Sequence, residues 1–176
     1  MAASFQNQYI FDSGPLITSC KFSVTGRLVL DHILSRCAVT IPASVSYEVT
    51  VAGNRYPDAR AAQQRISNAQ IAVVSPPAVP DLERLIAPYG LGHGERDSIL
   101  LTSLSDFQGA TVVIDDHLAC LVSDRLGVGK SFLLDVIADL AKAGEFDRRL
   151  AENIVLAIQA RYPAAFVAHT LLLIRR

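Results

Sequence analysis

The stretch YIFDSGPLIT, residues 9–18, ends an apolar and aromatic run with an acid and then begins a second apolar run. Residues 8–11 have the composition of a short buried strand. A carboxylate at the end of such a strand either caps the next helix or serves as a ligand or reacting group. Asp12 alone does not decide between these roles. The choice depends on whether other acids occur at equivalent places in the chain.

Three other runs share the strand-like character of residues 8–11. They are CAVTIP at 37–42, AQIAVVSPP at 69–77 and TVVI at 111–114, the last followed at once by two acids. Segments of helix length lie between the runs, at 26–36, 43–51, 58–68, 80–88, 94–106 and 117–126. Strands separated by helices predict an α/β protein with a mostly parallel sheet covered on both faces, which is a three-layer α/β/α arrangement.

The segment at 43–51 has mixed signals. Val45, Val49 and Val51 favour a strand, whereas Pro42 suits the first turn of a helix. We expect a helix here, which places Glu48 on it.

After residue 130 the pattern becomes helical only. SFLLDVIADLAKAG is closed by Gly144, FDRRLAENIVLAIQARY is stopped by Pro163, and a final apolar stretch follows. The chain of 176 residues is 51% hydrophobic, with a mean hydropathy of +0.32, enough to bury one core. We expect a single domain over residues 1–176, and its parts are a core at about 8–145 and a helical tail at about 146–176.

Composition argues against several classes of protein. No apolar run reaches the roughly 20 residues of a membrane span, and the N-terminus lacks a signal-peptide pattern, so we expect a cytoplasmic protein with no membrane partner. The three cysteines are far apart and form no CxxC pair, which argues against disulfides and zinc. The net charge of −1 predicts no bulk attraction to nucleic acid, so a polyanionic substrate needs a local basic rim or bound cations.

Acids occur where the predicted strands end or on the helices that follow them. The carboxyl ends of parallel strands meet at one edge of a sheet, and ligands bind there. Each acid alone also suits a helix cap or a solvated charge, but a cluster of them repels itself unless divalent cations are present. Ligands that are all oxygen favour Mg²⁺ or Mn²⁺. The acids are Asp12, Glu48, Glu95, Asp97, Asp115 and Asp116.

Five motifs occur in a characteristic order: FDSGPLI, IPASVSYEVT, GHGERDSILL, VVIDDHLA and GVGKSFLLDVIADLAKAGE. Together they resemble the PIN-domain family, specifically the branch close to VapC-type toxin nucleases, over about residues 8–145. The resemblance implies a Rossmann-like α/β/α fold and a Mg²⁺- or Mn²⁺-dependent ribonuclease. Members of this branch are often toxins held inactive by a cognate antitoxin.

The resemblance also implies roles for the acids. The first family acid matches Asp12, the second Glu48 and the third Asp97, with Glu95 as an extra acid. The fourth matches Asp116, with Asp115 beside it.

Two features depart from the family pattern. Many members have Ser, Thr or Asn two places after the first acid, and here that place is Gly14, which leaves Ser13 as a substitute. The helical tail after residue 145 is absent from the short toxins.

The implied mechanism uses one or two metal ions that hold the scissile phosphate and lower the pKa of a bound water, which attacks in line and expels the 3′-oxygen. RNA is the expected substrate, and DNA remains an alternative. Possible partners are an antitoxin and a second copy of the chain. Apolar surface on the tail, including Leu150, Ile154 and Ala157 or Ile158, suggests such an association.

Other interpretations are weaker. LGVGKS at 126–131 suggests a phosphate loop, but the first glycine of that pattern is replaced by Asp124, so Lys130 is expected to border a helix instead. The four histidines lack zinc-ligand spacing. The alternative from another class is a catalytically silent PIN-like interaction module, which calorimetry of metal binding would distinguish.

Basic residues near the acids are candidates for substrate contact. Arg55, Arg60 and Arg65 recur every five residues, which spreads them around a helix as solvated charges. Arg96 lies between Glu95 and Asp97 in the sequence and is expected nearer the chemistry.

Overall fold

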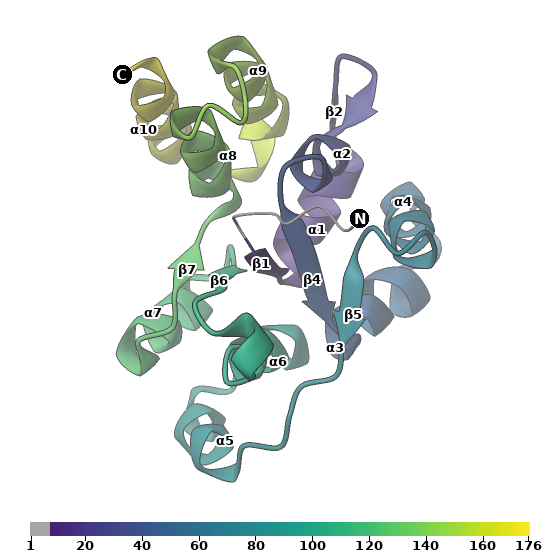
Figure 1. Ribbon diagram of the computed structural model, residues 1–176, viewed down its shortest axis with the longest axis vertical. Helices are drawn as coiled ribbons and strands as arrows, with labels where there is room; N and C mark the ends of the chain where they lie inside the picture. Colours follow the sequence, from purple (N-terminus) through teal and green to yellow (C-terminus); the bar gives the residue numbers. More distant parts are fainter. Residues whose placement is uncertain (1–7) are drawn as a thin grey trace.

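The computed structural model describes residues 8–176, and over that range five parallel strands form the central sheet (Figure 1). The strand order is β5-β4-β1-β6-β7. The strands are β1 (Gln8–Phe11), β4 (Ala38–Pro42), β5 (Ala72–Val74), β6 (Thr111–Val113) and β7 (Lys130–Ser131). The predicted α/β class is confirmed, since every run read as a strand from the sequence contributes to this sheet.

Helices cover both faces of the sheet, as the sequence predicts. They are α1 (Ser13–Lys21), α2 (Val29–Leu34), α3 (Ala43–Tyr47), α4 (Pro57–Ser67), α5 (Pro80–Ile86), α6 (His93–Leu101), α7 (His117–Leu126), α8 (Leu133–Lys142), α9 (Arg148–Ile158) and α10 (Ala164–Arg175). Alternate residues of β1 face opposite layers. Phe11 packs in the apolar cluster that includes residues of α1, α2, α8 and α9, whereas Ile10 packs with Leu101 of α6 and Ala119 of α7. The arrangement is therefore a three-layer α/β/α fold.

Two expectations about secondary structure are wrong. Residues 26–36 are not one helix, because a hairpin of β2 (Ser23–Val24) and β3 (Arg27–Leu28) precedes α2. Its turn residues, Thr25 and Gly26, have φ angles of 53° and 78°, which suit a tight hairpin turn with both φ values positive.

The chain after residue 130 is also not helical only, since β7 pairs in parallel with β6. Lys130 therefore lies in an edge strand, and its ammonium pairs with Asp124 at 3.3 Å. A phosphate loop would place this lysine at the start of a helix, so the phosphate-loop interpretation is rejected.

The segment at 43–51 is helical, as expected, but it contains an irregular turn. α3 continues into a π-helical turn over Glu48–Ala52, and the Gly53 N–H donates to the Glu48 carbonyl at 3.0 Å. Such turns are frequent at functional sites.

The helical tail packs on the domain at the end of the molecule where α8, α9 and α10 gather (Figure 1). Ile154 and Ile158 of α9 are fully buried in the main apolar cluster. The domain thus covers the α9 stripe itself, contrary to the expectation that this stripe needs a partner. Phe166 and Leu172 of α10 remain about half exposed. Among residues 8–176, no helix is both long enough and apolar enough to span a membrane.

The order of the strands identifies one edge as the place where a ligand binds. From β1 the chain proceeds outward through β4 to β5, and it then returns to the other side of β1 to form β6 and β7. In open parallel sheets, ligands bind beyond the carboxyl ends of the strands where the direction of winding reverses. Here that point lies between β1 and β6, and the residues that follow these strands include Asp12 and Asp115.

Candidate functional site

Asp12 lies at the N-cap position of α1 but does not act as a cap. Its carboxylate accepts no capping hydrogen bond from any described residue, and the residue is only 6% exposed. Asp116 occupies the same position at α7, and there a carboxylate oxygen accepts a hydrogen bond from the Ala119 N–H at 2.9 Å. Asp116 therefore caps its helix, whereas the carboxylate of Asp12 makes no capping hydrogen bond and is available for another role.

Gly94 allows α6 to approach the end of β1 closely. A Cβ atom at residue 94 would lie 2.8 Å from Asp12 Oδ1, 2.9 Å from Val45 Cγ2 and 3.5 Å from Glu48 Oε2. The first two distances are too short for any side chain to be accommodated without movement. The absence of a side chain at residue 94 thus leaves a small space that Asp12 and Glu48 both border.

Glu48 is supported by a neighbour of Asp12. The Ser13 hydroxyl donates to Glu48 Oε1 at 3.3 Å. Ser13 therefore links the end of β1 to the start of the π-helical turn, which is consistent with a supporting role for this serine.

Glu95 and Asp97 lie on the first turns of α6. Glu95 Oε2 accepts a hydrogen bond from the Gly92 N–H at 2.8 Å, which caps the helix. Burial raises the pKa of Glu95, and the charges of Asp116 and Glu48 raise it further. Glu95 is therefore electrostatically coupled to acids from two other elements.

Asp97 is three residues after Gly94, on the same face of α6, and it is buried. Its Oδ1 accepts hydrogen bonds from Arg96 Nε at 3.2 Å and from Nη2 at 3.1 Å. The Arg96 side chain is 42% exposed, so its guanidinium lies between a buried acid and solvent.

Asp115 is held by two donors from the C-terminal part of the chain. Its Oδ2 accepts a hydrogen bond from the Tyr162 hydroxyl at 2.6 Å, and its Oδ1 accepts one from the Leu133 N–H at 3.4 Å. Burial raises the pKa of Asp115, and these two hydrogen bonds oppose the increase. The sequence alone does not identify Tyr162, because no spacing or motif relates residue 162 to residue 115 before the tail is packed.

The pKa of Asp12 responds to the charges of several other acids. Burial raises the pKa of Asp12 to about 7, the Ser13 N–H opposes the increase, and the charges of Glu95, Glu48 and Asp115 add to it. Within residues 8–176, no three His, Cys, Asp or Glu side chains are close enough to enclose one ion. Three of the acids are engaged elsewhere: Asp97 by Arg96, Asp115 by Tyr162 and Asp116 by the start of α7.

The donor atoms around this space are of the type that Mg²⁺ and Mn²⁺ prefer. They are carboxylate oxygens, which are the ligands these ions prefer. Asp12 Oδ1 and Glu48 Oε2 also approach the same point beside Gly94, where a Cβ would otherwise lie. The structure thus places all six predicted acids at one edge of the sheet or at the helices that flank it, and Asp12 and Glu48 both border the space beside Gly94.

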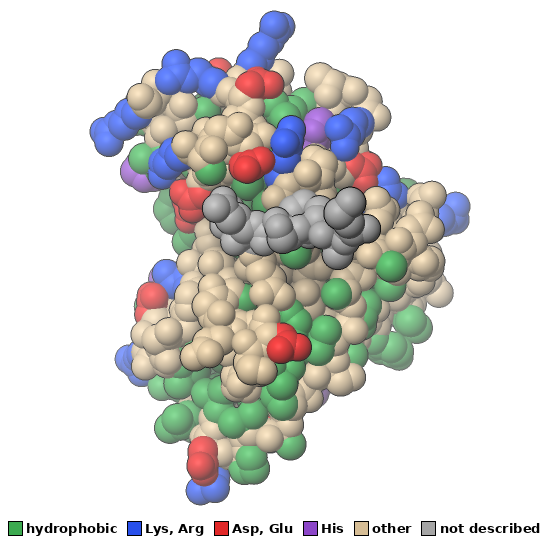
Figure 2. All heavy atoms as spheres, viewed as in Figure 1, with side chains coloured by type: hydrophobic (Ala, Val, Ile, Leu, Met, Phe, Trp, Pro, Cys, Tyr) green, Lys and Arg blue, Asp and Glu red, His purple; other side chains and the backbone are tan. Residues whose placement is uncertain are grey.

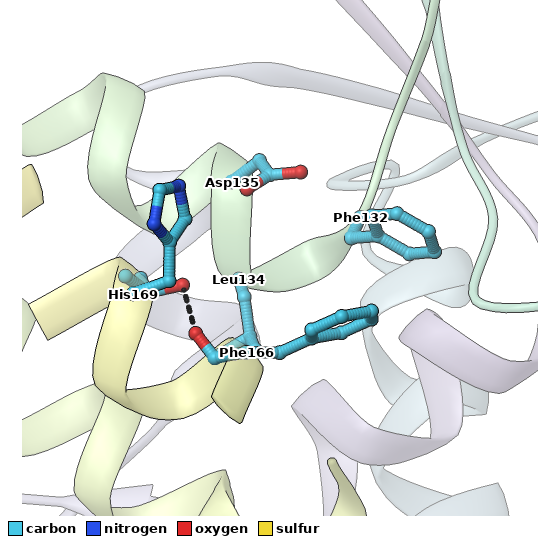
Figure 3. Close-up of a pocket in the computed structure, with 6 residues that line it drawn as sticks. Phe132, Leu134, Asp135, Phe166 and His169 are labelled. Carbon is cyan, nitrogen blue, oxygen red and sulfur yellow. Dashed lines mark hydrogen bonds between the residues drawn. The ribbon is translucent and has the colours of Figure 1, made fainter. Parts of the chain in front are cut away.

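An apolar pocket lies apart from these acids. It has a volume of about 320 Å³ and lies between α8 and α10, and none of the six acids is among its lining residues in the described chain. Figure 3 shows Phe132 and Phe166 in this pocket. Their ring centroids lie 5.9 Å apart. Its lining is mainly apolar and includes one acid, Asp135, so it lacks the group of carboxylates that lies where β1 and β6 end.

Basic side chains are concentrated away from the middle of the molecule. Figure 2 shows Lys and Arg side chains gathered over the end that carries the tail. Residues 146–176 contain five arginines and two acids, which gives this segment a charge of +3, against −1 for the whole chain. The tail is therefore more basic than the chain as a whole, and the charge of its Arg161 acts on Asp115.

A three-layer α/β/α fold with a buried acid after β1 and a partly buried acid after β6 defines the class of protein. A family model described as a PIN domain matches residues 8–170, and the chain belongs to the PIN-domain family. PIN domains are generally nucleases, and they generally use divalent metal ions. The match continues beyond residue 145 into α9 and α10. A comparison with curated proteins found no match.

Proposed function

We propose that the protein is a Mg²⁺- or Mn²⁺-dependent endoribonuclease. The observation that carries this proposal is the environment of Asp12, a buried acid without a capping hydrogen bond that meets Glu48 beside Gly94. The proposed catalytic residues and metal ligands are Asp12, Glu48, Asp97 and Asp116, with Asp115 and Glu95 as further ligands. The choice of RNA rests on the resemblance of the five motifs to VapC-type nucleases.

We assign a separate role in the proposed reaction to each residue of the site. The bound ion supplies positive charge at the scissile phosphate and lowers the pKa of a water molecule. Asp12 and Glu48 would hold this ion, and Ser13 orients Glu48 through their hydrogen bond. Arg96 keeps its guanidinium beside Asp97 and is exposed enough to contact a phosphate.

The proposal is tested with purified protein and a mixed pool of labelled RNA. We expect cleavage within the RNA when Mn²⁺ or Mg²⁺ is present and none when EDTA is added. A DNA pool of the same sequences tests the alternative substrate. If a control nuclease cuts the RNA but this protein leaves it intact at all metal concentrations, the enzyme proposal is wrong. A protein that also binds no Mn²⁺ in calorimetry would be a silent interaction module.

The same resemblance supports a biological role as a toxin. We infer that a cognate antitoxin protein binds the chain and holds it inactive.

The exposed Phe166 and Leu172 of α10 support a further proposal, that two copies associate through the tail. Light scattering that finds only a monomer would contradict this second association.

Arg96→Ala should weaken RNA binding and make it less dependent on salt. Loss of one phosphate contact reduces the slope of log K against log salt concentration by about 1. Arg84→Ala is the matched control, because Arg84 is an exposed arginine on α5 that also pairs with an acid, Asp81. Binding measured by fluorescence anisotropy at several salt concentrations checks this. An unchanged slope for Arg96→Ala would remove Arg96 from the substrate contacts.

A further inference from the structure

The C-terminal tail reaches the acidic edge of the sheet through Tyr162. This residue follows the 3₁₀ turn Gln159–Arg161 at the end of α9, and Pro163 after it begins α10. Tyr162 is thus the connection between two tail helices, and its ring is largely withdrawn from solvent. Its hydroxyl donates to Asp115 Oδ2 at 2.6 Å, although the two residues are far apart in the sequence.

This hydrogen bond is of a strong kind. A donor to an ionised carboxylate forms a shorter and stronger hydrogen bond than a donor to a neutral group, and 2.6 Å lies in the short range. The other oxygen of Asp115 accepts from the Leu133 N–H at the start of α8. Two donors from separate elements therefore hold both oxygens of this carboxylate, and they restrict its rotation.

Asp115 also belongs electrostatically to the acidic site. It directly follows Ile114 at the end of β6, and its charge contributes to the raised pKa of Asp12 at the end of β1. Arg161, the residue before Tyr162, is exposed and close enough that its charge acts on Asp115. The connection between α9 and α10 therefore brings a hydroxyl and a positive charge to the site from the tail.

We propose that Tyr162 is a positioning residue of the site and acts through Asp115. The proposal rests on the proposed function, in which Asp115 is a metal ligand. A hydrogen bond from behind a ligating carboxylate fixes its orientation, and loss of such a partner typically lowers metal affinity or activity about 10–100-fold. The tail then has two roles, because it packs on the core and also orients a ligand of the site.

Tyr162→Phe tests the proposal, since it keeps the ring and removes only the hydroxyl. We expect a loss of Mn²⁺ affinity of about tenfold or more in calorimetry. With limiting Mn²⁺, kcat for RNA should fall while KM changes little, because Tyr162 touches the ligand and not the substrate. Thermal melts in EDTA confirm that the variant is folded. Tyr89→Phe is the control, because its hydroxyl accepts a hydrogen bond from Arg125 Nη1 at 3.2 Å and is expected to leave Mn²⁺ affinity unchanged.

A double-mutant cycle separates positioning from a general structural role. If Tyr162 acts through Asp115, then Tyr162→Phe lowers Mn²⁺ affinity in the wild type but adds nothing in Asp115→Asn. An equal loss in both backgrounds overturns the proposal, as does wild-type affinity in Tyr162→Phe. If the wild type binds Mn²⁺ and cuts RNA, and the Tyr162→Phe variant does both equally well, then this inference alone is wrong. A wild type that binds no Mn²⁺ refutes the proposed function and this inference with it.

Discussion

In EDTA at pH 8, the Asp12→Asn variant should unfold at a higher temperature than the wild type. Asp12 is buried near Glu48, Glu95 and Asp115, and its ionised form is disfavoured in the folded protein. A pKa of about 7, against 3.8 for an ordinary aspartate, means that ionisation of Asp12 costs the folded state about 4 kcal/mol above pH 7. Asparagine keeps the shape without the charge, and each kcal/mol recovered raises the melting temperature by about 2–4 °C.

The sign of this effect depends on pH. Below pH 3.8 the Asp12 carboxyl is protonated in both the folded and the unfolded chain, so the group costs no stability. As pH rises from 3.8 to about 7, the unfolded chain loses the proton first, and the free energy of unfolding falls. The advantage of Asp12→Asn should therefore be absent at low pH, grow across this window and level off above about pH 7.

Added Mn²⁺ should reverse the order of the two proteins. An ion that binds only the folded state raises the melting temperature of the wild type, and Asp12→Asn has lost a ligand, so it should respond little. Asp147→Asn is the control, since Asp147 caps α9 through the Leu150 N–H and asparagine caps equally well. If Asp12→Asn melts at the wild-type temperature in EDTA and gains as much stability from Mn²⁺ as the wild type does, then Asp12 is only a structural cap, which asparagine replaces, and the metal-site proposal fails.

Asp97→Asn should abolish most of the RNA cleavage while leaving the fold intact. Metal-assisted stabilisation of a transition state is worth several kcal/mol, which corresponds to a loss of about a thousandfold in kcat. Asp97 is buried on the face of α6 that carries Gly94, so its replacement acts at the site and not at the surface. Initial rates with saturating Mn²⁺ and labelled RNA measure the effect, and circular dichroism verifies the fold.

The matched control for Asp97→Asn is Asp106→Asn. Asp106 is an exposed acid that lines a pocket at the opposite edge of the sheet, where the strands begin at Gln8, Ala38 and Ala72. Its replacement changes the net charge by the same amount and should leave cleavage unchanged. Equal rates for wild type and Asp97→Asn would exclude Asp97 from catalysis, whereas equal losses in both variants would indicate a general effect of charge.

The main sheet was predictable because its strands carry their own signal. β1, β4 and β6 are short runs rich in β-branched or aromatic residues. Such composition is typical of parallel strands that are buried on both faces. β7 has no such signal, since its two residues, Lys130 and Ser131, owe their strand geometry to pairing with β6. α1 is also hard to predict, because most of its residues after Gly14 are buried and no single apolar stripe marks it.

The site was predictable in its acids but not in their partners. The rule that ligands bind at the carboxyl ends of parallel strands identifies Asp12 and Asp115 before any coordinates are known. Both Asp12 and Asp116 are at N-cap positions, and only geometry shows that Asp116 alone accepts the capping bond. The partners of the other acids depend on how distant helices pack.

Packing also decides the role of one arginine. The five-residue spacing predicts a solvated Arg65, yet its guanidinium pairs with Asp31 at 2.8 Å. Helix α2 carries Asp31 and α4 carries Arg65, and both pack beside α1. Sequence spacing within α4 gives no information about this neighbour.

The order of the strands has a consequence for the nascent chain. A ribosome that has synthesised residues 1–74 has delivered Asp12 and Glu48, but Asp97 and Asp115 are not yet made. Because β1 and β6 must pair across most of the chain, the acidic edge forms through contacts of high sequence separation, which form slowly. An unfinished chain is thus expected to lack the complete set of acids, and Tyr162 arrives later still. For a proposed ribonuclease, the topology itself delays activity until residue 162 has been synthesised.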